Sequence, residues 1–154
     1  KIEALPEDIV WHFIGTLQSN KAKKVSQSFD VIHTLETESQ LTQLAKGLPI
    51  DCLIEINIGN ESNKSGLLPQ KLAPFHQLAL QCKSVQCRGL MCIGPMNPNP
   101  EFMRPFFRRM RELNDQIGGQ WLSMGMSNDF EVAIQEGATH IRVGSALFGE
   151  RARQ

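Results

Sequence analysis

The sequence has no excess of either charge. Among its 154 residues, 16 lysines and arginines balance 16 aspartates and glutamates, and the pI is about 7.1. A protein that binds nucleic acid or an anionic membrane through its overall field carries a surplus of positive charge, so the composition supports neither partner. Runs of apolar residues are too short to cross a bilayer, and tyrosine is absent altogether.

Cysteine is scarce and lacks the spacing of a cofactor or redox site. Cys52, Cys82, Cys87 and Cys92 form no C-x-x-C pair, and we expect buried reduced thiols, which suit a cytoplasmic protein. The histidines add no metal-ligand spacing, and no Walker-type loop or nucleophile elbow is present. The sequence therefore predicts no metal site and identifies no catalytic residue.

What the sequence does contain is one unit repeated six times, a strand-like run followed by a helical pattern. Alternation of this kind predicts an α/β fold with a parallel sheet and helical crossovers. A doubly wound sheet and a (β/α)8 TIM barrel both fit, although six units are too few to close a barrel. The strand-like runs are 9–15, 31–36, 52–58, 87–94, 121–126 and 139–145, and the helical patterns are 18–29, 37–46, 69–82, 101–117, 127–137 and 146–151.

The first residues, KIEALPED, are typical of the end of a helix and the loop into a strand. We therefore expect two further βα units before Lys1. On this interpretation residues 1–154 are a single barrel domain that lacks its first two units, so that only the last six are present.

Two short polar turns carry the candidate site. The first, GMS, ends at Ser127, which is either a helix N-cap, with Asp129 and Glu131 complementing the helix dipole, or a phosphate ligand. The second, VGS, places Gly144 and Ser145 before the last helix, where free N–H groups bind anions. With two units added in front, these turns follow strands seven and eight of a barrel, the usual phosphate site of that fold.

Arg142 lies just before the second turn. Period-two alternation in HIRVGS places His140, Arg142 and Gly144 on one face of the strand and Ile141 and Val143 on the other. In a barrel the apolar face meets the helices, so the arginine points into the lumen near the C-terminal rim. A buried arginine needs an anionic or hydrogen-bonding partner. We therefore expect a small phosphorylated ligand.

Other polar positions leave two interpretations open. Glu55 and Asn57 share one face of an apolar strand, as a hydrogen-bonded lumen pair or as ligand contacts, and His12 is a structural or a functional histidine. Residues 20–24, NKAKK, indicate a solvated basic face. Residues 102–113, FMRPFFRRMREL, predict an amphipathic helix with its phenylalanines and methionines inward and its arginines exposed.

Five segments together resemble the pyridoxal 5′-phosphate homeostasis protein family, single-domain relatives of the alanine racemase barrel. They are WHFIGTLQSNK, IEINIGNESNKSG, RGLMCIG, LSMGMSNDFEVAI and IRVGSALFG, which extend over most of the chain. The resemblance implies a (β/α)8 barrel of the alanine racemase type that binds pyridoxal 5′-phosphate at its C-terminal mouth. It also implies a role in intracellular vitamin B6 and amino-acid homeostasis, with no established reaction and with cofactor-accepting enzymes as possible partners.

Carried over by motif, the resemblance places the phosphate at Ser127, Gly144 and Ser145 and the pyridine nitrogen at Arg142. Weaker expectations of contact fall on His12, Asn57 and Met124.

The matching segments depart from the family in one respect. Family members form a Schiff base through a lysine at the end of the first barrel strand, and no lysine of this chain lies in that motif. We expect the lysine to precede Lys1.

An alternative function is a pyridoxal phosphate-dependent amino-acid racemase. The racemase family uses a catalytic tyrosine supplied by a second domain, and the absence of tyrosine argues against that two-base route.

Overall fold

The computed structural model describes Leu5, Pro6 and residues 8–149. Its six strands form one parallel sheet in which each strand pairs with the next in chain order. They are β1 (His12–Phe13), β2 (Val31–Leu35), β3 (Ile50–Glu55), β4 (Val85–Met91), β5 (Trp121–Met126) and β6 (His140–Arg142). The predicted βα repeat is therefore confirmed.

Helices follow the strands as predicted, and short 3-10 turns precede three of them. The α-helices are α1 (Ala22–Val25), α2 (Glu38–Leu44), α3 (Leu72–Gln81), α4 (Arg104–Gln116), α5 (Phe130–Gln135) and α6 (Ser145–Phe148). The 3-10 turns are η2 (Ser19–Lys21), η3 (Pro69–Lys71) and η4 (Pro100–Met103). A capping box between Thr37 and Gln40 fixes the start of α2, because each side chain satisfies a free N–H of the other residue.

All of the strands except β5 are shorter than predicted, most of all β1 and β6. In β1 only His12 and Phe13 pair with β2, and the preceding Trp11 N–H donates instead to the Asp30 carboxylate at 2.7 Å. In β3 the regular ladder ends at Glu55, because the next residues turn to pair with the following loop through a bridge between Ile56 and Leu67. Local side-chain and loop contacts thus replace the ladder at these strand ends.

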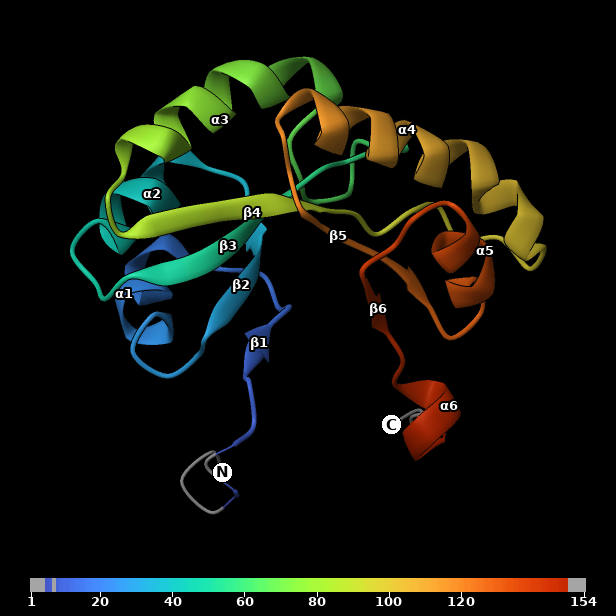
Figure 1. Cartoon of the computed structure of the whole chain (residues 1–154), viewed down its shortest axis with the longest axis horizontal. Coiled ribbons are helices and arrows are strands. Elements are labelled where there is room, and N and C mark those ends of the chain that lie inside the picture. Colours follow the sequence, from blue (N-terminus) through green and yellow to red (C-terminus); the bar gives the residue numbers. More distant parts are fainter. Residues whose placement is uncertain (1–4, 7, 150–154) are drawn as a thin grey trace.

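The sheet is strongly curved, and its helices lie on the convex side. Figure 1 shows the strands as an arc with α2, α3, α4 and α5 along the outside. The outermost strands β1 and β6 curve toward each other, since the rings of His12 and His140 have centroids 5.7 Å apart. A concave inner face is the arrangement expected of part of a barrel.

The two faces of the sheet have different cores. The convex face packs alternate strand residues, such as Ile54 and Leu122, against helix residues such as Phe107 and Met110. The concave face carries the other set of alternating side chains, which is largely polar. Gly89 in β4 pairs with Trp121 in β5, where its φ is +155° and an added Cβ would clash with the carbonyl oxygen of Trp121.

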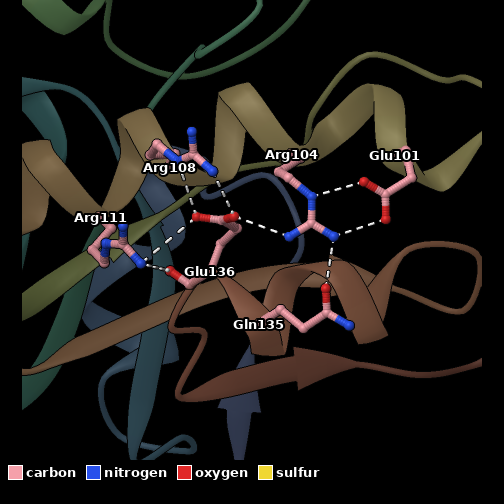
Figure 2. Close-up of polar contacts among 6 residues, drawn as sticks. All are labelled: Glu101, Arg104, Arg108, Arg111, Gln135 and Glu136. Atoms are coloured by element: carbon pink, nitrogen blue, oxygen red, sulfur yellow. Dashed lines mark hydrogen bonds and ion pairs between the residues drawn. The ribbon is translucent and has the colours of Figure 1, made fainter.

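The predicted amphipathic pattern of residues 102–113 is confirmed in part. Phe107 and Met110 pack inward and Arg108 and Arg111 are exposed, but Phe102 is 43% exposed and was wrongly expected to face the core. The arginines also form ion pairs that the sequence did not predict. Figure 2 shows Arg104, Arg108 and Arg111 converging on Glu136, at the end of α5, whose side chain is only 6% exposed. Hydrogen bonds from Arg108 and Arg104 hold the pKa of the Glu136 carboxyl below its ordinary value. These ion pairs fasten α4 to α5.

Two further expectations are confirmed, and one is not tested. All four cysteines are free thiols, with Cys52 and Cys92 buried and Cys82 and Cys87 partly buried. Within residues 20–24 only Ala22 is buried, as a solvated face requires. The expected helix end at the N-terminus falls largely on residues outside the described part of the chain.

Candidate functional site

The candidate site lies where the parallel strands end, an edge that we call the mouth. Polar residues lie there shortly after four of the strands: Glu36 after β2, Asn57 after β3, Ser127 after β5 and Ser145 after β6. Because the sheet is parallel and curved, residues far apart in sequence meet at this edge.

The two predicted turns come together at the mouth. The Ser145 hydroxyl donates to the Ser127 hydroxyl at 3.0 Å, and both side chains are at least partly open to solvent. Ser145 opens α6, with Gly144 as the residue before it. A Cβ at Gly144 would meet no atom within 4 Å among the residues that the structure describes, so their packing does not require the glycine.

The N-cap interpretation of Ser127 is wrong. Helix α5 begins at Phe130 and its N-cap residue is Asp129, two positions after the serine. The Asp129 carboxylate accepts from the Met126 N–H at 2.7 Å and so closes the turn that presents Ser127. A second contact, from the Asn128 amide to the Asn97 carbonyl at 3.1 Å, ties this turn to the loop after β4.

Arg142 projects into the concave face, as predicted. One terminal nitrogen donates to Ser123 Oγ and the other to the Cys92 carbonyl oxygen, both at 2.7 Å. Among the described residues no carboxylate pairs with this guanidinium, and burial lowers its pKa from the ordinary value. Among the described residues the site therefore holds a partly buried positive charge that is hydrogen-bonded to neutral acceptors.

Histidines fill the lumen below Arg142. His12 Nδ1 lies 2.8 Å from His33 Nε2, and His33 Nδ1 lies 2.9 Å from Ser123 Oγ. His140 packs its ring near His12 and His33 and against Trp121, at a centroid distance of 5.0 Å from the indole. Burial, reinforced by His12, Arg142 and His140, lowers the pKa of His33 to about 3, so this ring is neutral at physiological pH.

Glu55 also faces the mouth and is 6% exposed, yet its carboxylate makes no hydrogen bond or ion pair within the described part of the chain. Burial raises its pKa to about 7; the nearby Glu36 adds to the rise and Arg142 opposes it. The Asn57 side chain instead donates to the Glu61 and Lys64 carbonyls and accepts from the Glu61 N–H. The predicted hydrogen bond between Glu55 and Asn57 is therefore absent, and Asn57 organises the loop after β3.

Met124 is placed away from the mouth. Its side chain is fully buried in the convex-side core, on the face of β5 opposite Ser123, so only its backbone could approach a ligand. His12 lies in the lumen, where its Nδ1 is 2.8 Å from His33 Nε2, and its contact with a ligand stays a prediction.

His33 and Ser123 were not among the predicted site residues. His33 lies beside Thr34 in the strand run VIHTL, and Ser123 is the one polar side chain in the run LSMGM. Because a buried polar group requires a partner, such a position is the signal that sequence reasoning could have used.

A cavity of about 700 Å³ lies at the other end of the strands. It is lined by the starts of β3 and β4 and by Trp11, Asp30 and Arg88, so it is separate from the mouth. The described histidines, cysteines and carboxylates do not gather into a group that could hold a metal ion. No described helix has the length and apolar character needed to cross a bilayer.

Comparison with known proteins places this geometry in a family. The model of the family "Alanine racemase, N-terminal domain" matches residues 4–152. The "Pyridoxal phosphate homeostasis protein" of Aquifex aeolicus is 44% identical over 98% of this chain and 72% of its own length. PipY of Synechococcus elongatus PCC7942, whose structure has PLP bound, superposes with a TM-score of 0.80 at 33% identity, over 96% of this chain and 74% of that one.

Alanine racemase of Clostridium difficile 630 is 12% identical with a TM-score of 0.68, over 93% of this chain and 40% of its own, and it shares the fold alone. The chain therefore has an alanine racemase-type α/β fold and belongs to the pyridoxal phosphate homeostasis protein family.

Proposed function

We propose that this protein binds pyridoxal 5′-phosphate at the mouth and serves intracellular vitamin B6 and amino-acid homeostasis, without a catalytic reaction of its own. The observation that carries the proposal is the partly buried Arg142 guanidinium, which forms no ion pair with a described carboxylate. Even partial burial of a charge without an ion-pair partner is costly, so such a group indicates a site that a ligand completes.

The phosphate is proposed to bind at Ser127, Gly144 and Ser145. Two hydroxyls meet there beside an unfilled space at the glycine, and the first N–H groups of α6 lie at the same turn. Hydroxyls and free backbone N–H groups are the usual donors to a phosphate. This fit supports a phosphorylated ligand over a carboxylate, which has fewer oxygens to bind.

Arg142 is proposed to face the pyridine nitrogen. When bound, pyridoxal phosphate supplies an aldehyde and an electron-withdrawing ring. A guanidinium stays protonated, so it donates to the nitrogen and keeps that atom unprotonated, which weakens the ring as an electron sink. This arrangement favours carrying the cofactor over carbanion chemistry, in line with a homeostasis protein.

The proposal extends to location and partners. Four free thiols suit the reducing cytoplasm. Enzymes that accept pyridoxal phosphate are the proposed partners, because a carried cofactor must be delivered. The racemase alternative gains no support from the described site, and the chain has no tyrosine for a two-base route.

Equilibrium titration with pyridoxal phosphate, followed by absorbance, tests the site. We expect Arg142→Ala and Ser127→Ala each to weaken binding by about 10-fold or more, the value of a hydrogen bond to a charged group. Ser28→Ala, an exposed serine after α1, is the control and should bind as the wild type does. Unchanged affinity in both site variants would refute the assignment.

A further inference from the structure

The hydrogen bonds behind Arg142 run in one direction. A guanidinium has donors only, so Ser123 Oγ must accept the bond from Arg142. Ser123 is completely buried, and its own hydroxyl hydrogen then needs an acceptor. Within the described contacts that acceptor is Nδ1 of His33 at 2.9 Å.

This requirement fixes the tautomer of His33. If Nδ1 carried the proton, Ser123 would accept two hydrogen bonds and its buried O–H would have no partner, which is unfavourable. His33 therefore carries its proton on Nε2, which donates to His12 Nδ1 at 2.8 Å. The low pKa of His33 agrees, because a protonated ring would present a donor to Ser123 and a second positive charge to Arg142.

We infer that Ser123 and His33 are positioning residues that hold the Arg142 guanidinium in place for its ligand. The Cys92 carbonyl holds one terminal nitrogen of the guanidinium. The other donates to Ser123, which begins a hydrogen-bond chain that continues to His33 and His12. The Nε–H and one hydrogen on each terminal nitrogen remain for the ligand. The inference rests on the proposed function for the identity of that ligand, but the hydrogen-bond chain exists without it.

Nuclear magnetic resonance of the ligand-free protein tests the chain directly. Long-range proton–nitrogen spectra at pH 7 should show His33 neutral, with the proton on Nε2. Ser123→Ala should change the His33 nitrogen shifts and speed rotation of the Arg142 guanidinium. A His33 ring with its proton on Nδ1, or Arg142 dynamics that Ser123→Ala leaves unaltered, would overturn the inference.

A matched pair of variants tests the consequence for the ligand. Asparagine at position 33 places an amide oxygen near the position of Nδ1 and can accept from Ser123, whereas leucine cannot. We expect His33→Leu and Ser123→Ala to weaken pyridoxal phosphate binding roughly 10-fold, and His33→Asn to stay within about 2-fold of the wild type. Equal loss in His33→Asn and His33→Leu would contradict a positioning role.

Two measurements separate this inference from the proposed function. Competition by inorganic phosphate should be unchanged in these variants, since Ser127 and Ser145 are intact. If the wild type does not bind pyridoxal phosphate, the proposed function fails while the ligand-free spectra still decide the inference. Should His33→Leu not fold, as judged by circular dichroism, Ser123→Ala keeps the test decisive.

Discussion

The hydroxyl of Ser145 donates to the hydroxyl of Ser127 across 3.0 Å, although the two serines belong to different βα units. This contact exists because β5 and β6 are adjacent and parallel, so the turns after them end at the same edge. Neither serine caps its helix with its side chain. The two hydroxyls are thus presented together at the mouth.

The serine pair should act as a unit on phosphate. Replacing either residue with alanine removes one donor and leaves the other hydroxyl without this partner, so each variant should weaken pyridoxal phosphate binding by about 10-fold or more. Because the groups touch, the double variant should lose less than the product of the two single losses. A double-mutant cycle by calorimetry measures this coupling, and strictly multiplicative losses would show that the ligand contacts only one serine.

Gly144→Ala separates ligand binding from folding. The glycine has a φ of −116°, outside the left-handed region that favours glycine, and an added methyl group would meet no atom of the described residues within 4 Å. We expect the free energy of unfolding to change by less than about 0.5 kcal/mol. Affinity for inorganic phosphate should fall by about 10-fold or more if the methyl occupies the space of the ligand. Retained affinity would place the phosphate elsewhere.

Gly89→Ala should have the opposite effect to Gly144→Ala on stability. A Cβ at this position would clash with the Trp121 carbonyl oxygen, so the variant should be strongly destabilised, by roughly 2 kcal/mol or more, at a site remote from the mouth. Urea unfolding of both variants gives the comparison. Similar stabilities for the two would mean that the sheet adjusts more freely than its geometry indicates.

Much of the fold was predictable because periodicity reports local geometry. The residues 121–126 were predicted as a strand and form β5, and Pro69 opens η3 ahead of α3 where a proline was expected to start a helix. The face of Arg142 followed from alternation alone. Strand ends were less accurate, since contacts such as the one from Trp11 to Asp30 depend on residues 19 positions apart.

The contacts between residues of different strands and helices could not be predicted from the sequence. The interpretation of Ser127 as an N-cap was locally reasonable, but Asp129 competes for the same role and occupies it. The contact of Ser123 with His33 spans 90 positions, and nothing in either run specifies which polar residue faces it. The convergence of three α4 arginines on Glu136 was missed for the same reason.

Glu136→Gln should loosen the outer helices without affecting the mouth. The change removes the charge that three arginines share, so Tm should fall by roughly 3 °C or more. Arg109→Ala, which breaks only an exposed pair with Glu112, should leave Tm nearly unchanged. Differential scanning calorimetry compares the two. Equal shifts would indicate that the cluster contributes no more than an ordinary surface ion pair.

Glu55→Gln should reveal the cost of the unpaired carboxyl through pH. The folded protein holds a proton on Glu55 up to about pH 7, whereas the unfolded chain releases it near the ordinary value of 4.5. Between these values the folded state binds more protons, so the contribution of Glu55 to stability is greatest at low pH and is lost as the pH rises toward 7. Glutamine is neutral at every pH and does not incur this loss.

The free energy of unfolding of Glu55→Gln relative to the wild type should therefore improve by about 1–2 kcal/mol between pH 5 and pH 8, less than the full shift because the group is partly screened by solvent. Urea unfolding at both pH values measures the difference, with Glu38→Gln on the exposed first turn of α2 as the control for loss of a surface carboxylate. The same relative stability at pH 5 and pH 8 would mean that Glu55 has a partner at the mouth and is not held as an unpaired acid.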